Sequence, residues 1–228
     1  MIIRLLDFET TGLPPKAQVI EVGICDVDTE TRKVGEPFSM LCNPKAVIDP
    51  AAKAGHHITE ADLADAPPLD IAFRKMQEGN FDVWAAHNAP FEREFFKGGD
   101  KPWICTLKAA RQVFPEAPGH SNQVLRYYLG LPVIREIADL AHRAGPDAYV
   151  TAHLIVALLD AGATVEQMIN WTGGPSLLPT VQFGKHRGKK WEQVPYEYLT
   201  WIEGQANMDP DVKHTAKHHI NLRRGRAH

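Results

Sequence analysis

The sequence predicts an α/β fold in which helices cover a mixed β-sheet, followed by a small basic module at the C-terminal end. Strand-like runs come first in the chain and then alternate with helix-like runs, which is typical of a sheet covered by helices. The charge balance then changes near residue 180. Residues 1–180 contain 16 Lys and Arg against 23 Asp and Glu, whereas residues 181–228 contain 9 against 5. This change indicates two modules with different roles.

The opening segment predicts three strands joined by short links. Residues 2–13 form an apolar run that ends in two acids and a turn. Residues 19–27 alternate well enough to form a second strand, and residues 37–42 form a third. Because the links have hairpin length, we expect an antiparallel meander.

The middle of the chain alternates between helix and strand patterns. Thr59 followed by Asp62 resembles a helix start within residues 55–66. A long helix is expected to open at residues 142–147, because apolar residues with helical spacing follow it: Ala148, Ala152, Ile155 and Leu159. Between these two helices we expect helices over 69–78, near Pro90, over 107–114 and over 123–129, and short strands over 81–86 and 103–106.

A segment rich in Gly and Pro at residues 172–181 is the expected domain boundary. We therefore divide the chain into an α/β domain at 1–163, a helix and linker at 164–180, and a small basic module at 181–228. Within the module, helices are expected over 196–203 and from 211 to about 222.

Composition excludes several classes of protein. The 228 residues are 44% hydrophobic and 23% charged, as in ordinary globular proteins. No apolar run approaches the ~20 residues of a membrane helix, and the N-terminus lacks the pattern of a signal peptide. The three cysteines have no metal-binding or disulfide spacing. We therefore expect a cytoplasmic protein with no membrane partner.

Asp7 and Glu9 lie at the end of the first predicted strand. Alternate residues of a strand point to the same face, so the two carboxylates should lie together. Neighbouring carboxylates repel each other unless a cation lies between them. A metal site and a solvent-exposed polar turn both remain possible for this pair on its own.

Further polar residues follow in a recognisable order. His87 to Glu92 read His-Asn-Ala-Pro-Phe-Glu, and His142 precedes Asp147 by five positions. Each residue has an ordinary structural explanation, such as an acid in the first turn of a helix. Together with residues 7–13, however, their order resembles the DEDDh family of 3′→5′ exonucleases, which have an RNase H-like fold. The resemblance covers residues 1–163, and residues 103–106 and 183–189 also resemble one member of that family.

The resemblance implies a metal-dependent mechanism. Asp7 would bridge two divalent cations, Mg²⁺ or Mn²⁺, and Glu9 and Asp147 would complete the site. Carboxylates are the ligands that these cations prefer, and two cations about 3.5–4 Å apart stabilise both the attacking and the leaving oxygen. His142 would accept the proton of the attacking water, since the ordinary pKa of His is about 6.5. Glu92 departs from the family, which has Asp here; its carboxylate extends about 1.5 Å further and is expected to support the second cation.

Other motif residues imply contacts with nucleic acid. The resemblance assigns the 3′-terminal nucleotide to a set of residues from three segments: Thr10, Gly12, Leu13, His56, Ile58, His87, Asn88 and Phe91. Core packing is an equally good explanation for Leu13 and Phe91. In the module, Lys185, Arg187 and Lys189 crowd a turn between Phe183 and Trp191. Cations beside aromatic rings suit phosphate contact and base stacking, although a solvated charged face is the alternative.

The resemblance therefore implies a metal-dependent 3′→5′ exodeoxyribonuclease that releases nucleoside 5′-monophosphates, acting in DNA repair or end trimming. Its expected partner is a single-stranded DNA 3′ end, with duplex DNA contacted through the C-terminal module. One alternative is an enzyme that trims RNA 3′ ends, because no residue indicates recognition of the 2′-hydroxyl. Another is a non-catalytic nucleic-acid-binding module whose site is weakened by Glu92.

Overall fold

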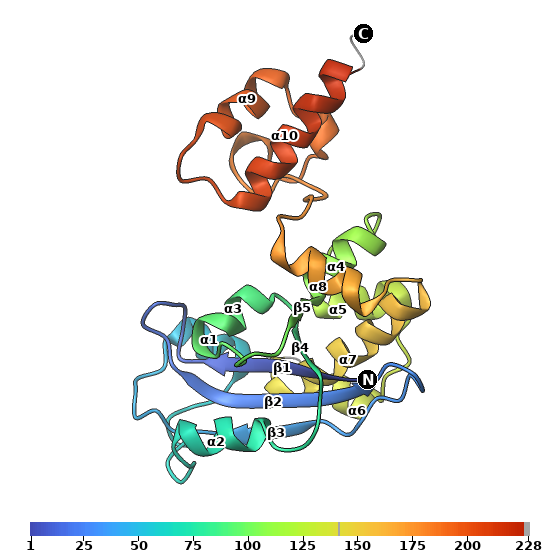
Figure 1. Cartoon of the computed structure of the whole chain (residues 1–228). Coiled ribbons are helices and arrows are strands. Elements are labelled where there is room, and N and C mark those ends of the chain that lie inside the picture. Colours follow the sequence, from blue (N-terminus) through green and yellow to red (C-terminus); the bar gives the residue numbers. More distant parts are fainter. Residues whose placement is uncertain (141, 226–228) are drawn as a thin grey trace.

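The computed structural model describes residues 1–140 and 142–225. Its core is a five-stranded sheet with the strand order β3-β2-β1-β4-β5 (Figure 1). β1 lies at the centre, antiparallel to β2 and parallel to β4. The mixed sheet and its opening antiparallel meander confirm the sequence-based prediction. The strands are β1 Ile2–Thr10, β2 Val19–Asp28, β3 Phe38–Leu41, β4 Val83–Ala86 and β5 Trp103–Cys105.

Helices cover both faces of the sheet because β1 is apolar on both. Ile3 and Leu5 pack in a cluster with α7, whereas Leu6 and Phe8 pack in a second cluster with α2 and α3. Asp7 and Glu9 continue the row of Ile3 and Leu5. The helices of this region are α1 Pro50–His56, α2 Leu69–Met76, α3 Ala89–Phe95, α4 Thr106–Val113, α5 Asn122–Leu129, α6 Arg135–Ala138, α7 Ala144–Asp160 and α8 Val165–Gly173.

The start of α7 lies directly on β2. A Cβ atom added to Gly23 would lie 2.0 Å from the carbonyl carbon of Ala144, a distance that no side chain tolerates. Glycine at this position therefore allows the helix backbone to approach the sheet. Its position on β2 is opposite Asp7 on β1. The close approach brings the first turn of α7 to the acidic end of β1.

The predicted helix start at Thr59 is wrong. The helix of this region is α1, which begins after Asp49 and ends before His57, a residue with a left-handed φ of 61°. Thr59 donates its backbone N–H and its hydroxyl to the Asp62 carboxylate, at 2.8 and 2.7 Å. These bonds close a turn instead of starting a helix.

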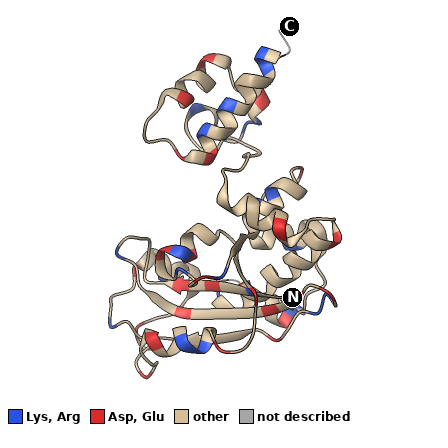
Figure 2. Cartoon of the chain, viewed as in Figure 1, with Lys and Arg blue, Asp and Glu red and all other residues tan. Residues whose placement is uncertain are grey.

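The C-terminal segment packs around its own hydrophobic cluster, which includes Val181, Trp191, Leu199 and Ile220. Most of it stands apart from the sheet, beyond the end of α8 (Figure 1), and its Asp211 contacts Arg111 of α4. Figure 2 shows acidic as well as basic residues along it. Its elements are η1 Gly184–His186, η2 Trp191–Gln193, α9 Tyr196–Gly204 and α10 Pro210–Gly225.

All three cysteines are buried and unpaired. Within the described residues, no single helix is long and apolar enough to cross a membrane, although α7 and α8 reach that length together across a bend of 112°.

Candidate active site

Three carboxylates converge where β1 meets α7. Asp7 and Glu9 come from β1, and Asp147 comes from the first turn of α7. Each offers a ligand oxygen, and these oxygens all lie within 4.8 Å of one another. The strand alternation places Asp7 and Glu9 on the face that α7 covers. Asp147 therefore meets them in one cluster, although it lies at least 138 positions later in the sequence.

The cluster is electrostatically unfavourable without a cation. Burial, followed by the charges of Asp147, Glu92 and Glu9, raises the pKa of Asp7 well above its usual value. Burial and Asp147 raise the pKa of Glu9 to about 8. Burial also raises the pKa of Asp147. Three acids that resist ionisation in one place fit a divalent cation, because a bound cation favours their charged forms.

Glu92 lies beside this cluster without being one of the three converging ligands. It is in α3, and its side chain is almost fully buried. Its Oε2 atom has no hydrogen-bond partner among the described residues. Burial and, to a smaller extent, the charge of Glu9 raise the pKa of Glu92 to about 8. An unpaired buried carboxylate oxygen is available as a ligand for a cation or for water bound to it.

His142 is exposed and lies two residues before α7, the helix that carries Asp147. Its backbone has a left-handed φ of 61°, and its N–H donates to Oδ2 of Asp147 at 2.8 Å. The hydrogen bond fixes the backbone of the histidine against one member of the carboxylate cluster. His142 is thus tethered to the carboxylate cluster through its backbone.

An ion pair between a buried acid and a partly exposed arginine, which sequence reasoning missed, anchors this segment. Glu21 is fully buried on β2, and its carboxylate accepts hydrogen bonds from Nε and Nη2 of Arg143 at 3.0 and 2.7 Å. It also accepts one from the backbone N–H of Ala144 at 3.1 Å. The signal in the sequence was an acid inside an apolar strand. In the structure, Glu21 pairs across the sheet with Glu9. Glu21 therefore positions the residues between His142 and Asp147.

Residues 5–155 match the model of the exonuclease (RNase T) family. The chain belongs to this exonuclease family. It is 36% identical over 223 residues to exodeoxyribonuclease 10 of Escherichia coli strain K12, covering 96% of this chain and 98% of the relative. It is 35% identical over 170 residues to a DNA polymerase III subunit epsilon-like protein of Rhodobacter capsulatus, covering 69% of this chain and 23% of that protein.

Solved structures agree with this assignment. Exonuclease X in complex with 5′ overhanging duplex DNA is similar with a TM-score of 0.63 and 34% identity, covering 75% of this chain and 99% of that one. Cell-death related nuclease 4 shares the fold with a TM-score of 0.57 at 17% identity. The RNase H-like fold and the resemblance to DEDDh exonucleases are confirmed, and the protein is an exonuclease.

Several residues that the sequence predicts to contact nucleic acid lie at the end of β1 or follow it in the chain. Thr10 is buried and donates its hydroxyl to the carbonyl of Gly12 at 2.7 Å. Leu13 is 80% exposed, so core packing does not explain it. His56 and Ile58 are buried, and Nδ1 of His56 accepts the N–H of Ile58 at 2.9 Å. An exposed apolar side chain therefore stands on a well-packed turn.

The segment from His87 to Glu92, called the second motif below, combines a fixed histidine with two accessible residues. The His87 ring lies 2.9 Å from Oγ1 of Thr106 and 2.6 Å from the carbonyl oxygen of His120. Burial lowers the pKa of His87 to about 4, so this ring is neutral. Both ring nitrogens are used inside the protein. Asn88 is exposed, and the ring of Phe91 is partly buried.

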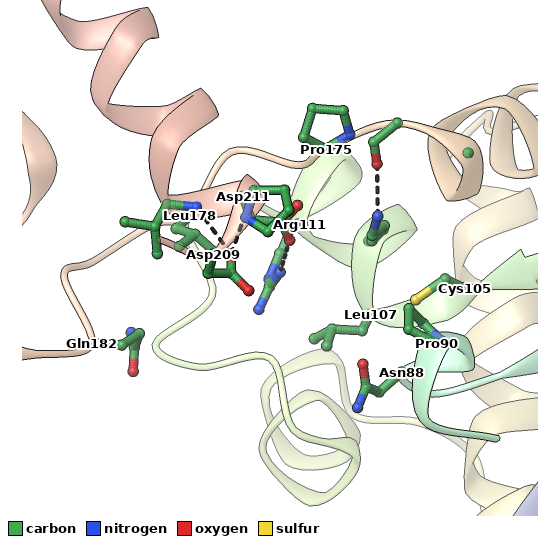
Figure 3. Close-up of a pocket in the computed structure, with 15 residues that line it drawn as sticks. Asn88, Pro90, Cys105, Leu107, Arg111, Pro175, Leu178, Gln182, Asp209 and Asp211 are labelled. Atoms are coloured by element: carbon green, nitrogen blue, oxygen red, sulfur yellow. Dashed lines mark hydrogen bonds and ion pairs between the residues drawn. The ribbon is translucent and has the colours of Figure 1, made fainter. Parts of the chain in front are cut away.

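A groove runs from this motif to the C-terminal segment (Figure 3). Arg111 on its wall donates to Asp211 of α10 at 3.2 Å, and Lys108 donates to the carbonyl of Gly174 at 2.6 Å. These contacts join α4 to the linker and to α10. The lining includes Asn88, Pro90, Leu107, Arg111, Gln182 and Asp209.

Proposed function

We propose that this exonuclease is a metal-dependent 3′→5′ exodeoxyribonuclease that releases nucleoside 5′-monophosphates from DNA 3′ ends. The observation that carries the proposal is the convergence of Asp7, Glu9 and Asp147, with ligand oxygens within 4.8 Å of one another. DNA as substrate is supported by the name of the Escherichia coli relative and by the DNA in the exonuclease X complex.

The donor set fits two divalent cations, Mg²⁺ or Mn²⁺. Asp7, Glu9 and Asp147 would hold them, with the unpaired Oε2 of Glu92 available to the second. Oxygen donors of this kind are the ligands that both cations prefer. When bound, such cations supply positive charge to the attacking and leaving oxygens of a phosphodiester.

In the proposal, His142 acts as general base and accepts a proton from the attacking water. Its exposed position leaves the imidazole accessible to that water, while the hydrogen bond from its backbone to Asp147 keeps it beside the carboxylates. The ion pair between Arg143 and Glu21 fixes this segment to β2. Histidine is the side chain that most often serves as a general base near neutral pH.

The 3′-terminal nucleotide is proposed to lie between the end of β1 and the second motif. Leu13 and Phe91 offer apolar contacts to the base, and Thr10, Gly12 and Asn88 offer polar ones. The buried His56, Ile58 and His87 support these segments. Nδ1 of His56 accepts the N–H of Ile58, and both ring nitrogens of His87 are engaged within the protein. A cytoplasmic location agrees with the unpaired cysteines. This location and a role in DNA repair remain predictions from the sequence.

Incubation of the protein with 5′-labelled DNA or RNA strands, in Mg²⁺, Mn²⁺ or EDTA, tests the proposal. A cation-dependent ladder of shortened DNA with mononucleotide release is expected. Degradation of RNA alone would favour the RNA-trimming alternative. Binding without degradation would favour the non-catalytic alternative, and cleavage that persists in EDTA would contradict the metal site.

A further inference from the structure

The C-terminal module presents a cluster of cations on one tight turn. Lys185, Arg187, Lys189 and Lys190 are all exposed, and residues 181–191 contain no acid. The turn is held by hydrogen bonds from the N–H of Val181 to the carbonyl of Lys189, and from the N–H of Gly188 to the carbonyl of Val181, at 2.9 and 2.8 Å. The cations therefore project from an ordered segment.

One aromatic ring of α9 lies against this turn, and a second ring stacks on the first. Tyr198 and Trp201 are stacked, with ring centroids 5.2 Å apart and planes at 25°. Nζ of Lys185 lies 5.4 Å from the Tyr198 centroid. A Cβ atom added to Gly184 would lie 2.6 Å from the Tyr198 hydroxyl, so the turn and the helix are in close contact. Trp201 is 49% exposed, so part of a large ring is accessible next to Tyr198, the residue that contacts Lys185.

The groove described above leads from the segment His87 to Glu92 toward this surface. It begins at Asn88 and Pro90 and reaches Gln182, which is directly followed by the turn (Figure 3). Of its two acids, Asp211 is paired with Arg111, and Asp209 accepts the N–H groups that open α10. A DNA strand that leaves the second motif along this groove would therefore arrive at the lysine and arginine side chains of the turn.

We propose that Lys185, Arg187 and Lys189, together with Tyr198 and Trp201, bind the single-stranded DNA that lies upstream of the 3′ end in the active site. This inference rests on the proposed function, because the substrate strand is its occupant. The cations contact phosphates and release counterions, and the exposed indole stacks on an unpaired base. The module thus holds the part of the substrate that the catalytic pocket does not reach.

The charge contribution is tested with the full chain in EDTA, where binding is measured without hydrolysis. The double variant Lys185→Ala/Lys189→Ala is compared with Lys33→Ala/Lys217→Ala, which removes two exposed cations elsewhere. Fluorescence anisotropy is recorded on a tetranucleotide and on a strand several times longer, over a range of salt. The test variant should weaken binding of the longer strand alone and reduce its salt slope by about 1.4, the value for two phosphate contacts on single-stranded DNA.

The stacking contribution is tested with Trp201→Ala, and Leu222→Ala provides a control with a similarly exposed apolar side chain. The first variant should weaken binding of the longer strand by about fivefold or more, since stacking of one base contributes at least that factor. Trp201→Phe should restore much of the affinity. Thermal unfolding of each variant checks that it remains folded.

The proposal is overturned if the test and control pairs lose equal affinity, or if the tetranucleotide and the longer strand are affected alike. Failure of the proposed function is distinguishable from failure of this inference. If the enzyme is active and the module variants bind the longer strand normally, only the proposed DNA-binding surface of the module is overturned. Inactive enzyme whose module variants bind weakly would overturn only the nuclease proposal.

Discussion

In the absence of divalent cations, the free energy of unfolding should fall as the pH rises from about 5 to about 8. The pKa of both Glu9 and Glu92 is raised to about 8 in the folded protein, whereas an unfolded Glu titrates near 4.3. Between these values the folded state binds protons that the unfolded state has released. The stabilisation is therefore complete below the unfolded pKa and is lost as the pH rises through the folded pKa.

The distances within the carboxylate cluster give the magnitude. Two like charges 4.8 Å apart repel by about 3 kcal/mol at an effective dielectric constant of about 20. A shift of one pKa unit corresponds to about 1.4 kcal/mol, so a decrease of about 3 kcal/mol across this pH range is a conservative expectation. Such a decrease is a large part of a typical total stability of about 5–15 kcal/mol.

Urea unfolding in EDTA and in excess Mg²⁺ provides the assay. Mg²⁺ should remove most of the pH dependence and add about 2.7 kcal/mol when its concentration is about a hundredfold above its dissociation constant. Glu92→Gln should flatten the pH dependence measured in EDTA. The control is Glu94→Gln, which changes an exposed acid of the same helix. An unchanged slope in Glu92→Gln, or the same slope with and without Mg²⁺, would refute the reasoning.

Two further predictions concern the segment that leads into α7. Glu21→Gln leaves Arg143 without its buried counter-charge; we expect a loss of about 1–3 kcal/mol in urea unfolding and a lower kcat. Wild-type kcat in this variant would contradict the positioning role. Gly23→Ala forces a Cβ to within 2.0 Å of the Ala144 backbone and should destabilise the protein by several kcal/mol or prevent folding, as judged by circular dichroism. Gly55→Ala, which meets no atom within 4 Å, should be nearly neutral, and equal effects of the two changes would contradict the close helix approach.

The strand pattern was sufficient to predict that Asp7 and Glu9 share a face, because alternation follows from backbone geometry alone. It was not sufficient to bring Asp147 to them, since that depends on how α7 packs on β2; only the family resemblance supplied this residue. Glu21 was missed because its partner, Arg143, lies 122 positions away in the sequence. The helix predicted at Thr59 failed because Asp62 accepts both of the Thr59 donors and closes a turn.

Direct titration of Mn²⁺ into the wild-type protein and into Asp147→Asn tests the central claim, which is that acids of β1 and α7 together bind divalent cations. Glu166→Gln, which alters an exposed acid of α8, is the matched control. We predict saturable binding of two ions to the wild type and the control, with weakened or lost binding in Asp147→Asn. Identical Mn²⁺ binding by all three proteins would contradict the account.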